Sequence, residues 1–365
     1  MIIKKHLNLY TALLILSEIF FLLSYGKPAS SNPLTLMEEL QSLDTGKYID
    51  SVPYSSFSAM PSDPSWIIYK YKKSVCKCIF EEDFHIAYKK KKNTENIVFS
   101  LSGGGACWEG NAACMKYAKL PKGWKDSAGF PFNGWSVIHM PYCDGSVHMG
   151  DNVISYNGKV HNHMGLKLTT AGVSLMKKIN PNPKKILITG SSAGGYGTFI
   201  AYLLIRRLFP DSALYIFNDS GPGLWNQENG MMEKINKAWN YISFFPKSCT
   251  NCDSHLIYLY DWILERDPNV KIGLFSSYND STVGSYYLKM NTPETPDAYK
   301  NLLISISGEI HKKHPGSFKR FFIDSDIHCV VNAPGKYSYK VQGITLYKWI
   351  RNMINDDSGW KDLLE

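Results

Sequence analysis

An apolar run leads directly into a glycine-rich turn in the segment Lys185-Ile-Leu-Ile-Thr-Gly-Ser-Ser-Ala-Gly-Gly-Tyr-Gly-Thr-Phe-Ile200. The run at residues 186–189 predicts a buried strand, and residues 193–207 predict a helix. Between them, Gly190-x-Ser192-x-Gly194 has the spacing of a nucleophile elbow, a strained turn that lifts a serine hydroxyl off a sheet. Glycine suits the crowded positions beside such a turn because it has no side chain to clash. The pattern favours Ser192 as a nucleophile, and the alternative is a glycine turn that carries no chemistry.

Strands and helices alternate on both sides of this turn. Further apolar strands are expected at residues 96–101, 134–140, 213–217, 270–275 and 318–323. Helical periodicity occurs at residues 165–179, 231–245, 255–265, 295–313 and 341–353. This alternation predicts an α/β fold with a mainly parallel central sheet and helices on both faces, whereas residues 66–89 predict an antiparallel meander. With no repeat or long linker, residues 27–365 are expected to form a single domain.

The N-terminus has the pattern of a secretory signal peptide over residues 1–26. Basic residues precede an apolar run at residues 7–23, and small residues follow it. Glu18 interrupts the run, which disfavours a membrane-spanning helix. We therefore expect a secreted protein with no membrane span after cleavage, and the alternative is an uncleaved signal anchor.

The composition is that of a folded protein, because 44% of the 365 residues are hydrophobic and 13% are aromatic. The formal net charge of +8 has one dense basic run, at residues 89–92. No nucleic-acid-binding pattern accompanies this run, so no nucleic-acid partner is expected. The positive balance would instead help to attract an anionic polymer.

Eight cysteines follow the expected signal peptide, and an even number in a secreted chain favours disulfides. They are Cys76, Cys78, Cys107, Cys114, Cys143, Cys249, Cys252 and Cys329. Cys249-x-x-Cys252 has two other interpretations, half of a zinc site or a redox pair. No second motif follows at zinc-finger spacing, so we expect neither a metal nor another cofactor.

A serine nucleophile needs a histidine base and an acid that orients the histidine. In folds with a nucleophile elbow these residues follow one another in the order serine, acid, histidine. Asp280 comes just after the strand at 270–275, and His328 comes just after the strand at 318–323. We therefore predict a triad of Ser192, Asp280 and His328.

The rival bases and acids fit this order or placement less well. His311 and His314 lie on or at the end of a predicted helix, and His161 and His163 precede the serine. Asp324 and Asp326 are very close in sequence to His328.

Acyl transfer also needs backbone amides that face the developing oxyanion. The run Gly103-Gly-Gly-Ala106 follows the strand at 96–101 and matches the glycine-rich loop that accompanies an elbow. We expect the donors to be the amides of Gly105, Ala106 and Ala193, with Gly104 in reserve. The spacing fits neither a P-loop nor a dinucleotide motif, so nucleotide binding is not expected.

Six motifs follow one another along the chain. They are Leu101-Ser-Gly-Gly-Gly-Ala-Cys-Trp108, Pro141-Tyr-Cys143, Gly190-Ser-Ser-Ala-Gly-Gly-Tyr-Gly197, Asn218-Asp-Ser-Gly221, Tyr278-Asn-Asp280 and His328-Cys329. As a set, over roughly residues 60 to 355, they resemble the pectin acetylesterase family. That family includes Notum-type carboxylesterases, which remove a lipid acyl group from a secreted signalling protein. The resemblance implies an α/β-hydrolase fold and a metal-free serine carboxylesterase with the same triad.

The glycine loop departs from the family pattern Gly-Gly-Gly-Trp-Cys, because Ala106 stands where the tryptophan would be. The change keeps a backbone amide but alters the wall of the substrate pocket, for which Trp108 and Asn111 are candidate lining residues. The resemblance also implies disulfides. We expect a Cys107–Cys114 bridge, a second bridge from Cys143 to Cys76 or Cys78, an unusually short loop if Cys249 pairs with Cys252, and no obvious partner for Cys329.

The leading interpretation is a secreted esterase that removes acetyl groups from a polysaccharide. One alternative is a Notum-like hydrolase that removes a lipid acyl group from a protein, and another is a non-catalytic binding protein on a hydrolase scaffold. The expected partner is accordingly an acylated glycan or an acylated protein, and a monomer is assumed.

Overall fold

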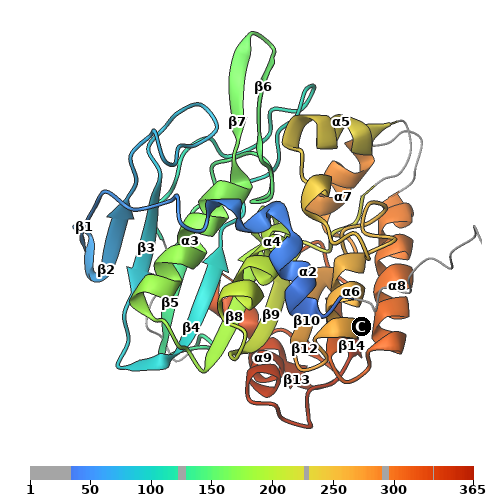
Figure 1. Ribbon diagram of the computed structural model, residues 1–365. Helices are drawn as coiled ribbons and strands as arrows, with labels where there is room; N and C mark the ends of the chain where they lie inside the picture. Colours follow the sequence, from blue (N-terminus) through green and yellow to red (C-terminus); the bar gives the residue numbers. More distant parts are fainter. Residues whose placement is uncertain (1–33, 122–128, 226–229, 290–295, 332) are drawn as a thin grey trace, which may run out of the picture. The chain divides into compact units, whose positions relative to one another are not determined.

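The structure is a computed structural model that describes residues 34–121, 129–225, 230–289, 296–331 and 333–365. Within these residues ten strands form one sheet in the order β1-β2-β3-β5-β4-β8-β9-β10-β11-β14 (Figure 1). From β5 to β14 in this order the neighbouring strands are parallel, and β1, β2 and β3 add an antiparallel edge next to β5. The mainly parallel sheet predicted from the sequence is therefore present.

The strands of this sheet are β1 Ser56–Met60, β2 Asp63–Lys70, β3 His85–Lys89, β4 Asn93–Leu101, β5 Trp135–Met140, β8 Lys185–Ser191, β9 Ala213–Asp219, β10 Lys271–Ser277, β11 Phe318–Ile323 and β14 Leu363–Leu364. Two small hairpins lie outside it, β6 Asn152–Tyr156 with β7 Lys159–His163, and β12 Lys340–Val341 with β13 Ile344–Thr345. The α-helices are α2 Leu36–Ser42, α3 Gly165–Ile179, α4 Ala193–Leu208, α5 Met231–Trp239, α6 Tyr258–Arg266, α7 Ser281–Lys289, α8 Pro296–Lys313 and α9 Leu346–Ile354.

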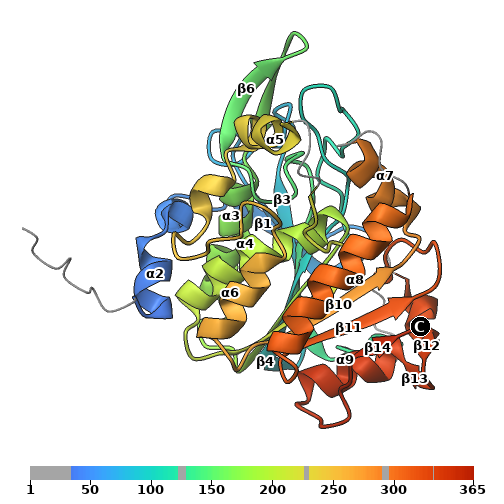
Figure 2. The ribbon, with the colours of Figure 1, turned by 90° about the vertical axis from the view of Figure 1, so that its right-hand side faces the viewer.

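Strand β8 lies inside the sheet, and helices cover both of its faces. Successive side chains of a strand point to opposite faces. Ile186 and Ile188 join the core that includes α3, α4, α6 and α8, whereas Leu187 joins a second core with Trp349 and Met353 of α9. Figure 2 shows α6 and α8 side by side. Burial on both faces explains why this strand is a continuous apolar run rather than an alternating one.

Several elements differ from those expected. The β6–β7 hairpin was not predicted, although its Asn157-Gly158 turn, with φ of 51° and 71°, is a common two-residue hairpin turn. The helix expected at 341–353 begins at Leu346, because the β12–β13 hairpin occupies its first residues. Residues Leu36–Glu365 form one compact unit, and within the described residues no helix is long and apolar enough to cross a membrane. The signal peptide expected at 1–26 lies outside the described residues.

Three disulfides join six of the eight cysteines. They are Cys78–Cys143, Cys107–Cys114 and Cys249–Cys252. Cys143 therefore pairs with Cys78, one of its two expected partners, and the short Cys249–Cys252 loop is closed. Within the part of the chain that the structure describes, Cys76 and Cys329 are free thiols.

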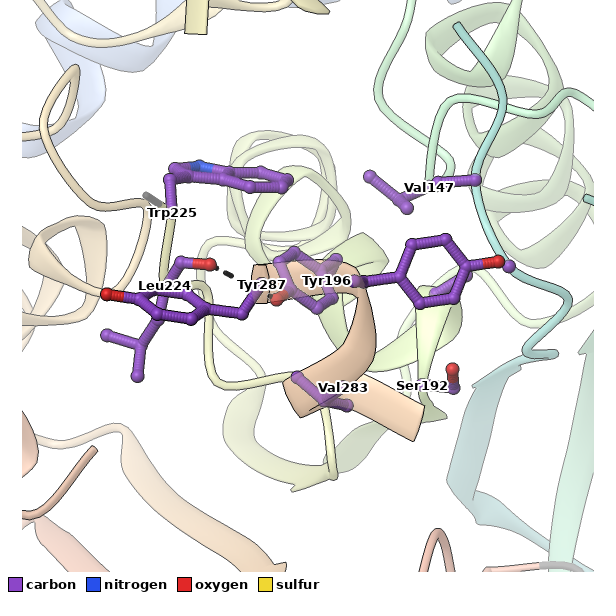
Figure 3. Close-up of a pocket in the computed structure, with 11 residues that line it drawn as sticks. Val147, Ser192, Tyr196, Leu224, Trp225, Val283 and Tyr287 are labelled. Carbon is purple, nitrogen blue, oxygen red and sulfur yellow. Dashed lines mark hydrogen bonds between the residues drawn. The ribbon is translucent and has the colours of Figure 1, made fainter. Parts of the chain in front are cut away.

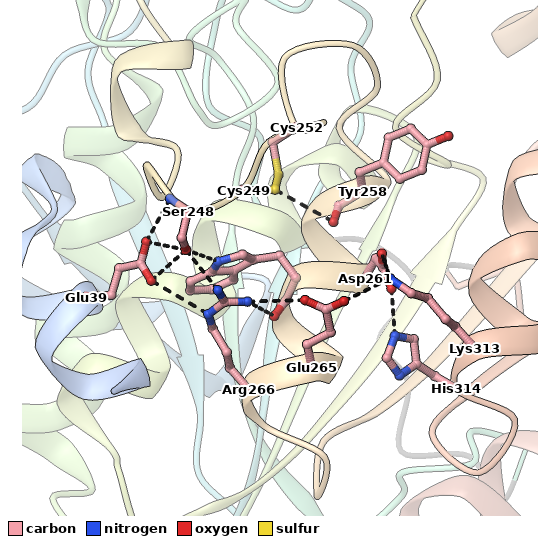
Figure 4. A network of polar contacts seen from close by, with 11 residues as sticks. Glu39, Ser248, Cys249, Cys252, Tyr258, Asp261, Glu265, Arg266, Lys313 and His314 are labelled. Atoms are coloured by element: carbon pink, nitrogen blue, oxygen red, sulfur yellow. Dashed lines mark hydrogen bonds and ion pairs between the residues drawn. A yellow bond between two sulfur atoms is a disulfide. The ribbon is translucent and has the colours of Figure 1, made fainter. Parts of the chain in front are cut away.

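A polar network ties α2 to α6 (Figure 4). The Glu39 carboxylate is buried and accepts hydrogen bonds from the Ser248 hydroxyl at 2.7 Å and the Ser248 amide at 3.2 Å. Arg266 approaches the same carboxylate at 3.7 Å and lies over the Trp262 ring. In the first turn of α6, Asp261 accepts a hydrogen bond from His314 Nε2 at 2.6 Å. These contacts hold helices together on one side of the sheet.

Candidate active site

The elbow forms as the glycine spacing predicts. Strand β8 ends at Ser191, Ser192 has φ of 57° and ψ of −121°, and α4 begins at Ala193. A Cβ atom on Gly190 would collide with the backbone of Gly194, and a Cβ atom on Gly194 would collide with the backbone of Leu101. A non-glycine residue in this conformation costs about 1–3 kcal/mol and persists only where its surroundings impose it. The turn is thus a strained feature built around Ser192.

Asp280 and His328 come from two loops that meet beyond the carboxyl ends of β10 and β11. His328 Nδ1 donates a hydrogen bond to Asp280 Oδ2 at 2.8 Å. The other carboxylate oxygen accepts the amides of Thr282 and Val283, each at 3.0 Å, at the start of α7. Asp280 is 1% exposed, so its charge is held in place by these partners. The pair leaves His328 Nε2 as the nitrogen available for proton transfer.

Ser192 and His328 line the same groove, together with the glycine loop Gly103 to Gly105. Lys116 and Lys119 also line this groove, with Tyr117 between them in sequence. The Tyr117 side chain is 54% exposed, and the Lys119 ammonium lies 5.5 Å from the centre of its ring. The groove therefore combines a nucleophile, a histidine and a basic, partly aromatic rim.

The glycine loop pairs with the residues that follow it, and this pairing involves one of the expected oxyanion donors. The Ala106 amide donates to the Ala113 carbonyl at 3.1 Å, and the Met115 amide donates to the Gly104 carbonyl at 2.7 Å. Ala106 is therefore engaged in a backbone bridge, which the Cys107–Cys114 disulfide fastens. Among the described residues, no hydrogen bond involves the amides of Gly104, Gly105 or Ala193. Of the expected donors Gly105, Ala106 and Ala193, Ala106 is thus the one whose amide already has a backbone partner among the described residues, and Gly104, held in reserve above, has none there.

An apolar pocket also borders Ser192 (Figure 3). Its lining residues are Gly105, Ala106, Val147, Ser192, Ala193, Tyr196, Leu224, Trp225, Val283, Tyr286 and Tyr287. Trp108 and Asn111, the expected lining residues, are not among them. Trp108 is 3% exposed and packs edge-on against Trp239, and the Asn111 amide group donates to the Ala106 carbonyl at 2.8 Å.

The residues that line this apolar pocket carry little signal in the sequence. Val283 and Tyr287 are four residues apart on α7, a spacing that places them on one helix face, but this helix was not predicted. Leu224 and Trp225 follow the Asn218-Asp-Ser-Gly221 motif in an irregular loop. Periodicity cannot single out residues of this kind.

The rival histidines are occupied elsewhere. His161 stacks on Tyr156, and His163 Nδ1 bonds to the Asp144 carbonyl at 3.0 Å. His311 Nδ1 bonds to the Phe318 carbonyl at 2.8 Å, and His314 pairs with Asp261. None of these four lines the groove or the pocket beside Ser192. Of the rival acids, Asp324 accepts the Asn279 side-chain amide at 3.0 Å instead of a histidine.

Two comparisons with known proteins bear on this arrangement. The family model described as Pectinacetylesterase matches residues 69–257. The solved structure of the Wnt deacylase Notum from Drosophila is similar, with a TM-score of 0.57 and 14% sequence identity, over 86% of this chain and 96% of that chain. No curated protein matches the sequence. The likeness to the Notum structure confirms the expected α/β-hydrolase fold.

The family match covers more than half of the chain and includes the glycine loop and Ser192, whereas Asp280 and His328 come after it. The resemblance stated from the motifs is therefore confirmed, and the chain belongs to the pectinacetylesterase family.

Proposed function

We propose that this protein is a serine carboxylesterase that uses Ser192, His328 and Asp280 as a catalytic triad. The observation that carries the proposal is the His328–Asp280 hydrogen bond at 2.8 Å, formed in the groove that also contains Ser192. Asp280 holds the imidazole in the tautomer that leaves Nε2 able to accept a proton. His328 takes the hydroxyl proton as Ser192 attacks the ester carbonyl.

The negative charge that develops on the carbonyl oxygen is stabilised by the amides of Ala193 and Gly105, with Gly104 beside them. His328 then gives its proton to the departing alcohol, leaving the acyl group on Ser192. A water molecule enters, His328 removes its proton, and attack on the acyl-enzyme releases the acid and restores the serine. Every step uses a side chain or amide of the described chain, and none requires a metal.

The substrate we favour is an acetylated, negatively charged polysaccharide. Lys116 and Lys119 line the groove on the side where the alcohol part of the ester would lie, and Tyr117 offers an exposed ring between them. The formal net charge of +8 would also attract an anionic chain. These features support a glycan as the acceptor of the acyl group.

A second candidate is the removal of a longer, lipid acyl group, and the apolar pocket beside Ser192 supports it. Its lining includes Trp225, Leu224 and Val283 (Figure 3). An acetyl group would use little of this lining, whereas each buried methylene of a longer chain would contribute about 0.8 kcal/mol. The similar Notum structure is described as that of a Wnt deacylase.

Turnover of nitrophenyl esters that differ only in acyl length tests the proposal and separates the candidates. Wild-type protein should hydrolyse the acetyl ester, and Ser192→Ala should not, while Ser191→Ala serves as the neighbouring control. A higher kcat/KM for octanoyl than for acetyl would favour the lipid candidate. Full activity of Ser192→Ala would contradict the mechanism, and a protein that neither turns over esters nor reacts with a fluorophosphonate would be a non-catalytic binding protein.

We further propose that residues 1–26 are removed and that residues 27–365 are secreted as one domain. The three disulfides support passage through an oxidising compartment. Expression of the full chain in eukaryotic cells, with N-terminal sequencing of the medium and the membrane fraction, tests this. Protein in the medium that begins near residue 27 is expected, and an intact N-terminus in the membrane fraction would indicate a signal anchor.

A further inference from the structure

Asp219 contacts both the nucleophile and the loop that carries the histidine. It is the last residue of β9, and its backbone carbonyl accepts the Ser192 amide at 2.8 Å. Its side chain is 0% exposed, and Oδ2 accepts the amides of Val330 and Val331, each at 2.8 Å. One residue thus bonds to Ser192 through its backbone and to the segment just after His328 through its carboxylate.

The segment that Asp219 holds is an irregular turn. Cys329, directly after His328, has φ of 63°, a conformation that few non-glycine residues adopt. Its amide donates to the Ser220 hydroxyl at 3.3 Å, and its carbonyl accepts the Lys336 ammonium at 2.9 Å. An irregular turn has no helix or sheet ladder to hold it, so these bonds set where His328 lies.

We propose that Asp219 is a positioning residue, whose carboxylate fixes the His328 loop in the place from which the imidazole can serve Ser192. This inference rests on the proposed triad. Asp219 does not touch the reacting atoms, since its side chain accepts the amides of Val330 and Val331 and, at 3.4 Å, the Ser220 hydroxyl. Asp280 orients the ring, and Asp219 places the backbone that carries it.

The buried negative charge of this carboxylate is unfavourable to the fold. Burial raises the pKa of Asp219 to about 6, even though the two amides and the charges of His328 and Lys336 act to lower it. Burial raises the pKa of the Cys329 thiol and of the Tyr337 hydroxyl, and the nearby Asp219 carboxylate adds to both rises. When folding raises the pKa of a carboxyl, the protein loses stability as pH rises from the unfolded-state pKa to the folded-state pKa. Above about pH 6 the buried charge therefore weakens the fold.

Two substitutions separate positioning from a merely structural role. In Asp219→Asn, the amide oxygen can accept both backbone amides while the buried charge is removed. In Asp219→Ala, both carboxylate oxygens are lost. We expect Asp219→Ala to lower kcat on nitrophenyl acetate by about 100-fold with KM nearly unchanged, because a displaced catalytic group costs that much. Asp219→Asn should recover much of this loss and have a Tm at pH 7.5 no lower than that of the wild type.

Asp267→Asn is a matched control, because Asp267 is also buried and accepts bonds from the Tyr202 hydroxyl at 2.7 Å and Arg206 Nε at 2.8 Å. Asp267 does not line the groove, so Asp267→Asn should keep the wild-type kcat. Its Tm should fall, because the two buried hydrogen bonds are weakened. Unchanged kcat in Asp219→Ala, or equal kcat losses in Asp219→Ala and Asp219→Asn, would overturn the positioning role. Ser192→Ala is measured in parallel. Activity retained there would refute the triad itself, and activity lost there while Asp219→Ala is unaffected would refute only the role of Asp219.

Discussion

Among the described residues, two aspartate–histidine pairs are within hydrogen-bond distance, and only one of them has the setting of a catalytic site. Asp280 and His328 are 2.8 Å apart, and Asp261 and His314 are 2.6 Å apart. The first pair uses Nδ1 of the histidine and leaves Nε2 available, whereas the second uses Nε2. His328 shares a groove with Ser192, whereas His314 lies between α6 and α8 (Figure 4).

A short carboxylate–imidazole contact therefore does not by itself indicate catalysis. The pair can transfer a proton to or from a substrate only if the second ring nitrogen of the histidine is not engaged and faces a reacting group. The Asp261 carboxylate contacts His314 and also the Lys313 ammonium, which is 2.7 Å away, so it belongs to a partly exposed charge network. The Asp280 carboxylate is bound by His328 and by backbone amides, and it is buried.

The largest expected effect comes from removing each histidine. His328→Ala should lower kcat on nitrophenyl acetate by roughly 10⁵- to 10⁶-fold, as loss of a triad base does. His314→Ala should leave kcat within about twofold, because His314 does not line the groove, and should lower Tm, because it removes a partly buried hydrogen bond. Steady-state kinetics and thermal unfolding of the two variants measure both quantities. Similar kcat values for the two variants would break the distinction between the pairs.

The next effect comes from the acids. Asp280→Asn should lower kcat by about 10³- to 10⁴-fold, because the amide no longer holds the imidazole in the useful tautomer or stabilises its charged form. Asp261→Asn should have no effect on kcat. A pH–rate profile accompanies the kinetics, and an Asp280→Asn enzyme with the wild-type rate across the profile would remove Asp280 from the triad.

A smaller effect is expected in the apolar pocket. Ala106→Leu adds side-chain volume to the pocket and leaves the backbone amide in its bridge to Ala113. It should lower kcat/KM for an octanoyl ester by about tenfold and leave that for an acetyl ester within about twofold. Ala213→Leu, at an exposed position that lines neither this pocket nor the groove, is the control. Equal losses on both esters would show that the pocket does not hold the acyl chain.

The smallest effect is expected at the basic rim. Replacing Lys116 and Lys119 by Gln should raise KM for an acetylated acidic glycan by a few-fold and weaken its dependence on salt, because screened surface charges act mainly on encounter. Turnover of uncharged nitrophenyl acetate should not change. Lys247 and Lys312, which are exposed and not part of the groove, provide a double-Gln control with the same net charge. Equal behaviour of the two double variants would assign the effect to net charge alone.

Local patterns predicted the parts of this molecule that depend on local geometry. The apolar run of β8 and the spacing of Gly190, Ser192 and Gly194 predict a strand, a strained turn and a helix, because each follows from residues close in sequence. The order of Asp280 and His328 after their strands likewise follows from where parallel strands end.

Long-range pairing decided what the patterns could not. The Ala106 amide is unavailable because residues 104–106 pair with 113–115, which a glycine-rich loop does not reveal. Asp219 stands out only when the chain brings Val330 and Val331 to it from more than a hundred residues away. The apolar pocket beside Ser192 combines residues of α7 with residues of distant loops, and no periodicity links them.

The most direct test of the triad is covalent labelling with a fluorophosphonate, followed by intact mass and peptide mapping. We predict one adduct per chain, on Ser192, that forms at the wild-type rate in Ser191→Ala and His314→Ala. The adduct should be absent in Ser192→Ala and form at least about 100-fold more slowly in His328→Ala. An adduct on another residue, or labelling of the His328→Ala variant at the wild-type rate, would contradict the account.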